Sequence, residues 1–586
     1  MVTFTNLGRI LIMFNIKKTT SLKMIVMAGT AVALLTSPAF AQVENATQIA
    51  DPARIGQELL GLDTLPALSR SVVVEKTAVQ NAPANAASIV FHLESLQIDG
   101  INTYSADDID SIYRDKLGTS VSLADIYEIA NTLTNKYRNE GYILTQVIIP
   151  PQTIEGGIVK LRVVEGFVDQ IIIEGEPREG ALKTIKQYAE NLRKNNILNA
   201  KNMERYLLLI NDLPGISARS ILSPSKTLTG ASDLKIIIER DNYEAEIGLD
   251  NHGSRFLGPY QASFSGAANS RFGYNERISG RIVVSGDKDR KDELMFGSVV
   301  YEQPISRYGS KIRFIGSLTS TEPGDDLDEF DVKGNSKFFS ATLSHPLIRS
   351  RTMNLYTRAS FDLRNIKSRN NLEPSREDKI RSVRIGTTFQ FMDTLFGVGV
   401  NALDFEISRG IDVFGATDKG DANITRARGN PKYTKAELQV QRLQRITPSV
   451  NLLLAGQGQW SATPLLSSEE FGVGGFNLGR GYDSSEIVGD DGIAGKVELQ
   501  WNEPHKIKYI HDYQLFGFFD VGRIWDQDAT TLANKRESLA SVGFGVRADV
   551  TEKTKAGFGV AFPLTHRVNT TNDRDPRFYF SVTHEF

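Results

Sequence analysis

From about Asp241 to the last residue, apolar and polar side chains alternate along the chain with a period of two. In the segment SLASVGFGVRADV, one face carries Val542, Phe544 and Val546, whereas the other carries serine, glycine, arginine and aspartate. The segments YEAEIGLD, GKVELQWN and RFYFSVTHEF alternate in the same way. Successive side chains of a β-strand point to opposite faces, so the pattern predicts strands with one apolar face. The second half of the chain is therefore predicted to be all β.

Two architectures fit such alternation: a soluble sandwich with one face on a core, or a membrane barrel with one face in lipid. The polar faces carry charges and glycines at strand centres. A water-filled interior tolerates them, whereas Arg or Lys at a bilayer midplane costs about 2–4 kcal/mol. Short and long turns also alternate, as periplasmic and extracellular turns do. At roughly 20–22 residues for each strand with its turn, residues 241–586 predict a transmembrane barrel of about 16 antiparallel strands with an aqueous lumen.

The N-terminus has the pattern of an export signal. Three lysines precede an apolar run that ends in Ala39-Phe40-Ala41, which fits the cleavage rule for secreted proteins. An apolar run of about 12 residues is too short for a helix that spans a bilayer. Residues 1–41 are therefore predicted to be a signal peptide, and a buried N-terminal helix is the alternative.

Composition narrows the function further. The chain has no cysteine, which removes disulfides and thiolate chemistry. Its formal net charge of −3 gives no basic field, so we expect no nucleic-acid partner.

Residues 42–88 contain one short predicted helix and a linker. Asp51 can cap a helix whose first residue is Pro52. Ile55, Leu59 and Leu62 then recur on one helical face. The low-complexity stretch NAPANAAS follows as a linker.

Two α/β modules of similar size follow, at residues 89–165 and 166–240. The first module reads β-α-α-β-β: IVFHLESLQIDG is predicted as one strand, capping boxes at Ser105 and Ser122 begin two helices, and YILTQVIIP and GIVKLRVVEG are two further strands. The second module repeats this order, with helices near residues 179–193 and 199–212. The repeat predicts two copies of one small fold in series.

One barrel loop, GGFNLGRGYDSSEIVGDDG at residues 474–492, sets Arg480 between two glycines. In the later strand LFGFFDVGRIW, Leu515 and Phe519 share the apolar face, which places Asp520 on the lumenal face. A solvated surface loop with an incidental arginine remains the alternative for this motif alone.

Two α/β modules before a barrel of this length resemble the two-partner secretion transporters, the TpsB family of haemolysin secretion/activation proteins of the ShlB/FhaC/HecB type. This family lies within the BamA-like POTRA-barrel superfamily. In the first module, GYILTQVIIPPQTIEGGIVKLRVVEG resembles the family's POTRA signature at Gly141, Tyr142, Pro151, Gln152, Gly157, Glu165 and Gly166. In the barrel, LGRGY at residues 478–482 resembles the superfamily's Val-Arg-Gly-Phe/Tyr motif, with Gly479 where that motif usually has an apolar residue.

The resemblance implies that a loop around residues 471–495 folds back into the lumen. Arg480, followed by Gly481 and Tyr482, would then meet Asp520 on the wall, and a guanidinium can bind a carboxylate with two hydrogen bonds. Breaking one side of such a pair would cost about 3–5 kcal/mol, less the effect of lumen water. The resemblance also implies that the helix of Ile55, Leu59 and Leu62 can plug the pore; a disordered tail is the alternative.

For function, the resemblance implies export of an unfolded secreted partner, adhesin-like or haemolysin-like, across the bacterial outer membrane. The POTRA modules would receive it in the periplasm, by strand pairing at an edge such as Ile143–Ile149 or Ile216–Leu222. Those segments are otherwise simply packed strands. Outer-membrane lipid and lipopolysaccharide would surround a monomeric barrel. An assembly factor that inserts other barrels and a passive porin with binding domains are the alternatives.

An enzyme is not expected. The chain has no Gly-x-Ser-x-Gly element that would mark a catalytic nucleophile with a histidine partner, and its seven histidines are not paired at metal-ligand spacing. We expect no cofactor and no metal. The pairs Asp325-Asp326 and Asp490-Asp491 are interpreted as loop charges that bind solvent or lipopolysaccharide-bridging cations.

Overall fold

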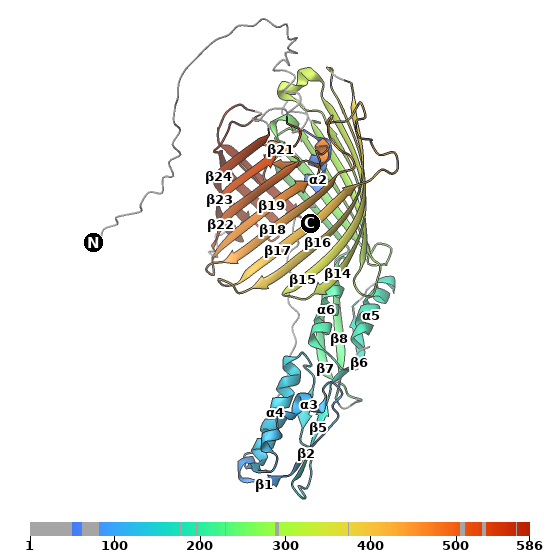
Figure 1. Ribbon diagram of the computed structural model, residues 1–586, viewed down its shortest axis with the longest axis vertical. Coiled ribbons are helices and arrows are strands. Elements are labelled where there is room, and N and C mark those ends of the chain that lie inside the picture. The colour runs from blue at the N-terminus through green and yellow to red at the C-terminus, as the bar shows by residue number, and fades with distance from the viewer. Residues whose placement is uncertain are drawn as a thin grey trace, which may run out of the picture. The chain divides into compact units, whose positions relative to one another are not determined.

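The computed structural model describes residues 50–60, 81–175, 179–193, 197–228, 230–286, 292–372, 374–503, 510–529, 535–569 and 571–586. The predicted signal peptide and Leu62 lie outside this part of the chain. Within it lie one N-terminal helix, two small α/β modules and a closed β-barrel (Figure 1).

Sixteen antiparallel strands form the barrel, and each pairs with the next along the chain. Pairing of the last strand with the first closes the cylinder. This confirms the predicted barrel of about 16 strands. The strands are β9 (Tyr243–Asp250), β10 (Tyr260–Asn269), β11 (Arg277–Gly286), β12 (Leu294–Pro304), β13 (Lys311–Thr321), β14 (Lys333–Arg349), β15 (Met353–Arg369), β16 (Arg376–Asp393), β17 (Gly399–Gly410), β18 (Thr434–Arg445), β19 (Val450–Ser461), β22 (Asp491–Glu503), β23 (Asp512–Trp525), β24 (Arg536–Asp549), β25 (Thr554–Pro563) and β26 (Arg577–Glu585).

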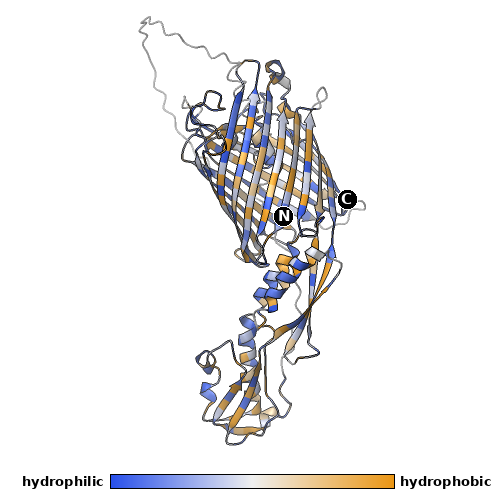
Figure 2. Ribbon diagram, turned by 90° about the vertical axis from the view of Figure 1, so that its right-hand side faces the viewer, coloured by the Kyte–Doolittle hydropathy of each residue, from blue (hydrophilic) through white to orange (hydrophobic). Residues whose placement is uncertain are grey.

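The outer wall of the barrel is apolar, as the alternation predicts. Large apolar side chains such as Leu249, Phe544 and Phe578 are exposed on it. The intervening residues face the lumen, and Asp520 among them is fully buried. Figure 2 shows hydrophobic and hydrophilic bands following one another along the strands. Among the described residues, no helix combines the length and apolar character needed to cross a bilayer.

The first module contains two sheets. Strands β1 (Val90–Leu93) and β3 (Thr119–Ser122) pair with each other, while β2 (Ser95–Asp99), β5 (Ile158–Val164) and β4 (Gln146–Ile148) form a second sheet in that order. The helical elements are η1 (Ala86–Ser88), α3 (Ala106–Asp110), η2 (Arg114–Lys116) and α4 (Leu123–Asn139). Ser105 and Ser122 begin α3 and α4 with capping boxes, as predicted.

Two strand predictions in this module are wrong in detail. The predicted strand IVFHLESLQIDG breaks at Glu94, whose amide donates to Gly157 O at 2.9 Å, and its two halves join different sheets. Of YILTQVIIP, only Gln146–Ile148 pairs as a strand. Ile143 and Leu144 instead pack against the core of the second module, so tertiary packing overrides the local strand pattern.

The second module has one three-stranded sheet and two helices. Its strands are β6 (Phe167–Glu174), β8 (Ala231–Arg240) and β7 (Ile216–Pro224), in that spatial order. Helices α5 (Glu179–Arg193) and α6 (Ala200–Asn211) pack on the sheet through a core that includes Tyr188 and Leu234. Strand β8 leads directly into β9, the first strand of the barrel.

The POTRA-signature residues of the first module lie in its core, in its turns and at its joint with the second module. Tyr142 packs edge-on against Tyr137, with ring centroids 5.9 Å apart. The Gln152 side chain donates to Lys160 O and accepts from Lys160 N, both at 2.7 Å, so it acts as a short extra strand beside β5. Pro151, just before it, is exposed.

The signature glycines allow close approach of backbone segments. Gly157 has φ +73°, and a Cβ there would lie 2.5 Å from His92 O. Gly166 O accepts from Leu198 N at 2.9 Å, and Gly141 O accepts from Ala200 N at 2.7 Å. The bond from Ala200 to Gly141 joins the two modules, whereas the bond from Leu198 to Gly166 lies within the second.

Glu165 holds the loop after β2. Its carboxylate accepts from the amides of Asn102 at 3.0 Å and Thr103 at 2.9 Å, and from the Tyr137 hydroxyl at 2.8 Å. Burial acts to raise the pKa of Glu165, but hydrogen bonds from Asn102, Tyr137 and Thr103 outweigh burial and hold the pKa below its usual range. The charged carboxylate therefore favours the folded module.

The stability of the first module should consequently depend on pH. The contribution of Glu165 is complete above its unfolded-state pKa of about 4.3 and is lost as pH falls through the lower folded-state pKa. We expect the opening of α4 and β5, measured by amide hydrogen exchange at each pH and corrected for the intrinsic exchange rate at that pH, to increase as pH falls from 6 towards 3. Glu165→Gln removes the ionisation and should flatten this dependence. Exposed Glu155→Gln is the control, and an equal flattening there would contradict the assignment.

Candidate functional site

The connection between β19 and β22, residues 462–490, folds into the lumen. It contains the short helix η5 (Ser467–Glu469) and a two-stranded ribbon of β20 (Phe471–Val473) and β21 (Ile487–Gly489). Apolar side chains of this loop pack against the inner wall at Ala494, Ile524 and Leu539. The loop is therefore packed against the wall along much of its length. It begins before the expected range of 471–495 and ends before β22 starts at Asp491.

Arg480 bridges this loop to the wall strand β23. Its Nε and Nη2 atoms donate to the two oxygens of Asp520 at 2.9 and 2.8 Å. The amides of Gly479 and Arg480 add hydrogen bonds to Asp520 Oδ2 at 3.1 and 3.0 Å. Four donors thus converge on one carboxylate that is shielded from water, which fixes both the side chain and the backbone of the loop tip.

Glu498 supplies a second carboxylate, which balances the positive charges of the arginines at this site. Arg480 Nη1 donates to Glu498 on β22 at 2.6 Å, and Arg547 on β24 donates to the same carboxylate at 2.8 Å. The Arg480 guanidinium also lies 3.4 Å from the centroid of the Phe518 ring. Two arginines therefore face two carboxylates, and neither charge of the Arg480–Asp520 pair is left uncompensated in the lumen.

The neighbours of Arg480 show why the motif has its small and aromatic residues. A Cβ on Gly481 would lie 2.8 Å from Ser541 Cβ, so glycine lets the loop touch the wall. Gly479 has φ +97°, a conformation in which an apolar side chain would be strained. Tyr482 is fully buried, and its hydroxyl lies 2.8 Å from Thr565 Oγ1. The structure thus brings the four predicted latch residues, Arg480, Gly481, Tyr482 and Asp520, to one site.

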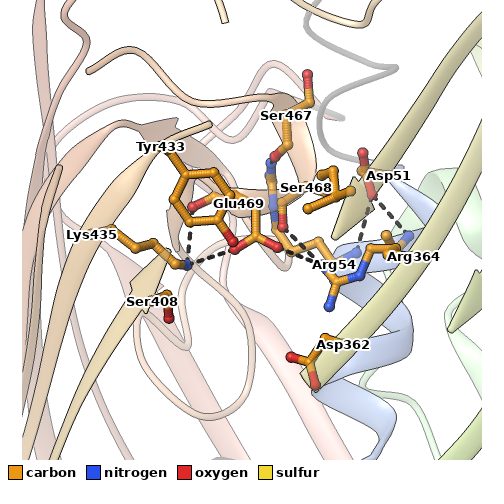
Figure 3. A network of polar contacts seen from close by, with 12 residues as sticks. Asp51, Arg54, Asp362, Arg364, Ser408, Tyr433, Lys435, Ser467, Ser468 and Glu469 are labelled. Carbon is orange, nitrogen blue, oxygen red and sulfur yellow. Dashed lines mark hydrogen bonds and ion pairs between the residues drawn. The ribbon is translucent and has the colours of Figure 1, made fainter. Parts of the chain in front are cut away.

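The base of the loop is held on a different part of the wall (Figure 3). Glu469 is buried, and its carboxylate is paired with Arg384 at 3.0 Å, Lys435 at 3.1 Å and Arg364 at 3.3 Å. These cations come from β16, β18 and β15. Arg384 is in turn bound to Asp362 at 2.6 Å. The loop is thus anchored at its tip and at its base, on separate groups of strands.

The interpretation of Asp490 as a solvent-binding loop charge is wrong. Asp490 is fully buried at the end of the loop, and Arg426 binds it at 2.7 Å. The same guanidinium binds Glu470 at 3.0 Å, Asp526 at 2.7 Å and also Asp528. Arg426 supplies the cation that balances these carboxylates, a long-range pairing that the sequence spacing does not reveal.

Helix α2 (Pro52–Leu60) lies against the inner wall at β12–β15. Asp51 caps it, with Oδ1 accepting from the Ala53 amide at 2.8 Å. Ile55 is buried against barrel residues that include Leu294, and Leu59 packs beside it. Gly56 lies so close to the wall that a Cβ there would be 2.6 Å from Thr319 Oγ1.

The helix also contacts both ends of the in-folded loop. Arg54 donates to Ser467 O and lies 3.7 Å from the Glu470 carboxylate. Glu58 accepts from Ser484 Oγ at 2.6 Å. Hydrogen bonds and an ion pair therefore connect the helix and the loop to each other within the lumen.

Sequence reasoning found Arg480 and Asp520 but missed Glu498 and Glu469. Glu498 lies between outward-facing Val497 and Leu499, so the alternation marks it as lumenal even though no motif names it. Glu469 sits in the irregular stretch SSEE, where no periodicity applies, and its cations are distant in sequence.

Comparison with known proteins bears on this architecture. Residues 230–548 match the family model of the haemolysin secretion/activation proteins ShlB/FhaC/HecB, and residues 91–166 match the ShlB-type POTRA domain. The chain belongs to the ShlB/FhaC/HecB family. It is thus a two-partner secretion transporter of the bacterial outer membrane, with its POTRA domains in the periplasm, and it translocates a secreted partner protein.

Similar proteins agree with this assignment. The transporter is 22% identical to the heme/hemopexin transporter protein HuxB of Haemophilus influenzae, over 85% of this chain and 87% of that protein. It is also 22% identical to the outer membrane transporter CdiB of Dickeya dadantii, over 75% and 78%. The solved structure of CdiB from Escherichia coli shares the fold, with a TM-score of 0.71 at 19% identity, over 95% of this chain and all of that one.

Removing the Arg480 side chain should release the loop tip. Arg480→Ala leaves Asp520 and Glu498 short of a cation, at a cost of about 3–5 kcal/mol in a sequestered site and less where lumen water reaches the charges. Ser541→Cys provides a reporter because Ser541 is buried under the loop and the chain has no cysteine of its own. We expect faster maleimide labelling at position 541 in the Arg480→Ala background.

The control for this measurement is Arg445→Ala, the exposed last residue of β18. Heat-modifiable mobility in gels should show that both variants retain a folded barrel. Equal labelling rates in the two backgrounds would mean that Arg480 does not hold the loop.

Proposed function

We propose that the secreted partner crosses the membrane unfolded, through the barrel lumen, and that its passage requires the in-folded loop and helix α2 to move. The observation behind this proposal is that neither element is a strand of the wall: the loop is fixed to it by ion pairs beside apolar packing, and the helix is hydrogen-bonded to the loop. The lumen of a barrel of this size is wide enough to conduct an aqueous solute once such elements leave.

The relatives support a proposal for the class of cargo. HpmB of Proteus mirabilis, 21% identical, is a hemolysin transporter protein, and HuxB is a heme/hemopexin transporter protein. We propose an adhesin-like or haemolysin-like exoprotein for this chain. The barrel is closed by its own strands, which supports a monomeric transporter.

We propose strand pairing as the mode of cargo capture, because both POTRA sheets have edges. Strands β2 and β4 are the edges of the first sheet, and β6 and β7 are those of the second. Of the two predicted segments, Ile143–Ile149 contains the three-residue β4, whereas Ile216–Leu222 lies within the nine-residue β7. Since backbone hydrogen bonds supply the affinity in this mode, the longer edge β7 is the better candidate.

Helix α2 is proposed to act as the plug of the pore. If so, fixing it in place should block transport. A Gly56→Cys/Thr319→Cys pair is expected to form a disulfide, since a Cβ at position 56 would lie against Thr319. Oxidised protein in planar bilayers should show fewer open-channel events than reduced protein, and secretion should resume on reduction.

Each single cysteine variant serves as a control for this lock, because neither can form the intramolecular bridge. Unchanged conductance and unchanged secretion in the oxidised double variant would show that α2 can stay in the lumen during transport, and would remove its role as a plug.

The export function itself is tested by comparing secreted proteins. In a deletion strain we expect one large protein to disappear from the medium, and Arg480→Ala should reduce the same protein several-fold while the barrel remains in the membrane. Arg445→Ala is the matched control. If deletion instead depleted many outer-membrane barrels and left the medium unchanged, the protein would be an assembly factor and the export proposal would fail.

A further inference from the structure

The outer wall between β10 and β14 has a hollow where glycines stand in place of residues with larger side chains. Two neighbouring rows of outward-facing residues cross these strands, and each row follows residues that pair across the sheet. One row is Gly266, Gly280, Val299, Gly316 and Phe339, and the other is Phe264, Ile282, Gly297, Leu318 and Lys337.

Glycines make the floor of this hollow and apolar side chains make its rim. A Cβ added at Gly297 or Gly316 would meet no atom within 4 Å. The rim residues stand well clear of the floor: Val299 is 60% exposed and Leu318 is 61% exposed. The hollow measures about 790 Å³. It is a groove in a wall that carries large apolar residues such as Phe544 and Phe578 elsewhere.

The surroundings of the groove determine what fills it. It lies within the apolar face that this outer-membrane barrel turns to the bilayer, so the groove is continuous with the lipid-facing surface. Lipid tails are as apolar as the rim, so selectivity here comes from close van der Waals fit instead of from exclusion of water. A flexible acyl chain can follow this shallow floor of backbone and glycine more closely than the rigid side chains of another protein can.

A cation lies at one end of the groove. Lys337 closes the second row and pairs across the sheet with Asn365 on β15. Both residues line the groove. Lys337 has no carboxylate partner among the described residues, and Asn365 Oδ1 accepts no hydrogen bond. Lys367, two residues from Asn365, lies on the same face but is paired with Glu377 at 3.5 Å, so Lys337 is the cation that the groove offers.

Strand direction places this polar end in the outer leaflet. The POTRA modules enter the barrel at the start of β9, which is therefore the periplasmic end of that strand. Strands alternate in direction, so β14 begins at the extracellular end, and Lys337 is near that beginning. The groove thus combines an apolar floor in the membrane with a cation near the cell surface.

We propose that this groove binds a phosphorylated glycolipid of the outer leaflet, the lipid A part of lipopolysaccharide. One acyl chain lies over Gly280, Gly297 and Gly316, and a phosphate of the sugar faces Lys337. An inner-leaflet phospholipid would place its headgroup at the opposite rim, away from this cation.

Site-specific photocrosslinking tests the proposal in the full-length protein. A benzophenone amino acid at Leu318, on the groove rim, is compared with one at Leu499, an exposed outward position on β22. The protein is reconstituted in nanodiscs of phosphatidylethanolamine that contain either lipid A or dephosphorylated lipid A. We expect lipid A to crosslink several-fold more at position 318 than at 499, and dephosphorylated lipid A to lose most of this excess.

Variants separate the headgroup from the acyl chain. Lys337→Ala should reduce lipid A crosslinking about fivefold, as expected for one basic residue at an anionic lipid surface. Gly297→Leu/Gly316→Leu fills the floor and should abolish the excess. Lys553→Ala, on the periplasmic turn before β25, and Gly517→Leu, an outward glycine on β23, are the matched controls and should leave it unchanged.

Three results would overturn the proposal. Equal crosslinking at positions 318 and 499 would mean that only ordinary boundary lipid is present. Equal crosslinking of lipid A and phosphatidylethanolamine at position 318 would remove the headgroup specificity. Crosslinks between two copies of the chain would make the groove a contact between barrels.

Discussion

Backbone hydrogen bonding in a medium without water determines this structure. Every strand that faces lipid must pair on both sides, because an unpaired amide or carbonyl in hydrocarbon costs several kcal/mol. Pairing of β26 with β9 meets that requirement by closing the sheet on itself. A closed sheet of this size encloses a water-accessible lumen. The wall therefore encloses a pore, and the in-folded loop and helix α2 narrow it.

Charged contacts fix the restricting elements at particular points, in addition to their apolar packing on the wall. Arg480 fixes the tip of the in-folded loop to β22 and β23, whereas Glu469 fixes its base to cations on β15, β16 and β18. Because every one of these charges has an opposite charge in contact, removing any single member leaves its partner uncompensated. The loop is consequently specified to one position even though it is rich in glycine, and helix α2 adds contacts to both of its ends.

The alternation of apolar and polar residues predicts the regular strands of this protein, but it gives no information on irregular segments. The barrel strands and the lumenal position of Asp520 follow from alternation, because successive side chains of a strand face opposite sides, and the strand number follows from the length of chain that each strand and turn uses. The break at Glu94 and the short β4 could not be predicted, since they depend on Gly157 and on packing of Ile143 against the second module. Glu469 and Asp490 were out of reach for the same reason: their cations, Arg384 and Arg426, come from strands and loops far along the chain.

Polar attachment suits a closure that has to open. A plug held only by apolar packing would expose that surface to lumen water each time it left, at about 25 cal/mol for each Å². Separated ions, by contrast, are solvated again as water enters, and the attraction between two unit charges at 4 Å falls to about 1 kcal/mol in bulk water. Contacts such as Arg480–Asp520 and Glu58–Ser484 are therefore strong while the loop and helix α2 occupy the lumen. They weaken as water takes the place of these elements. The same pairs that fix the closed arrangement thus lower the cost of leaving it.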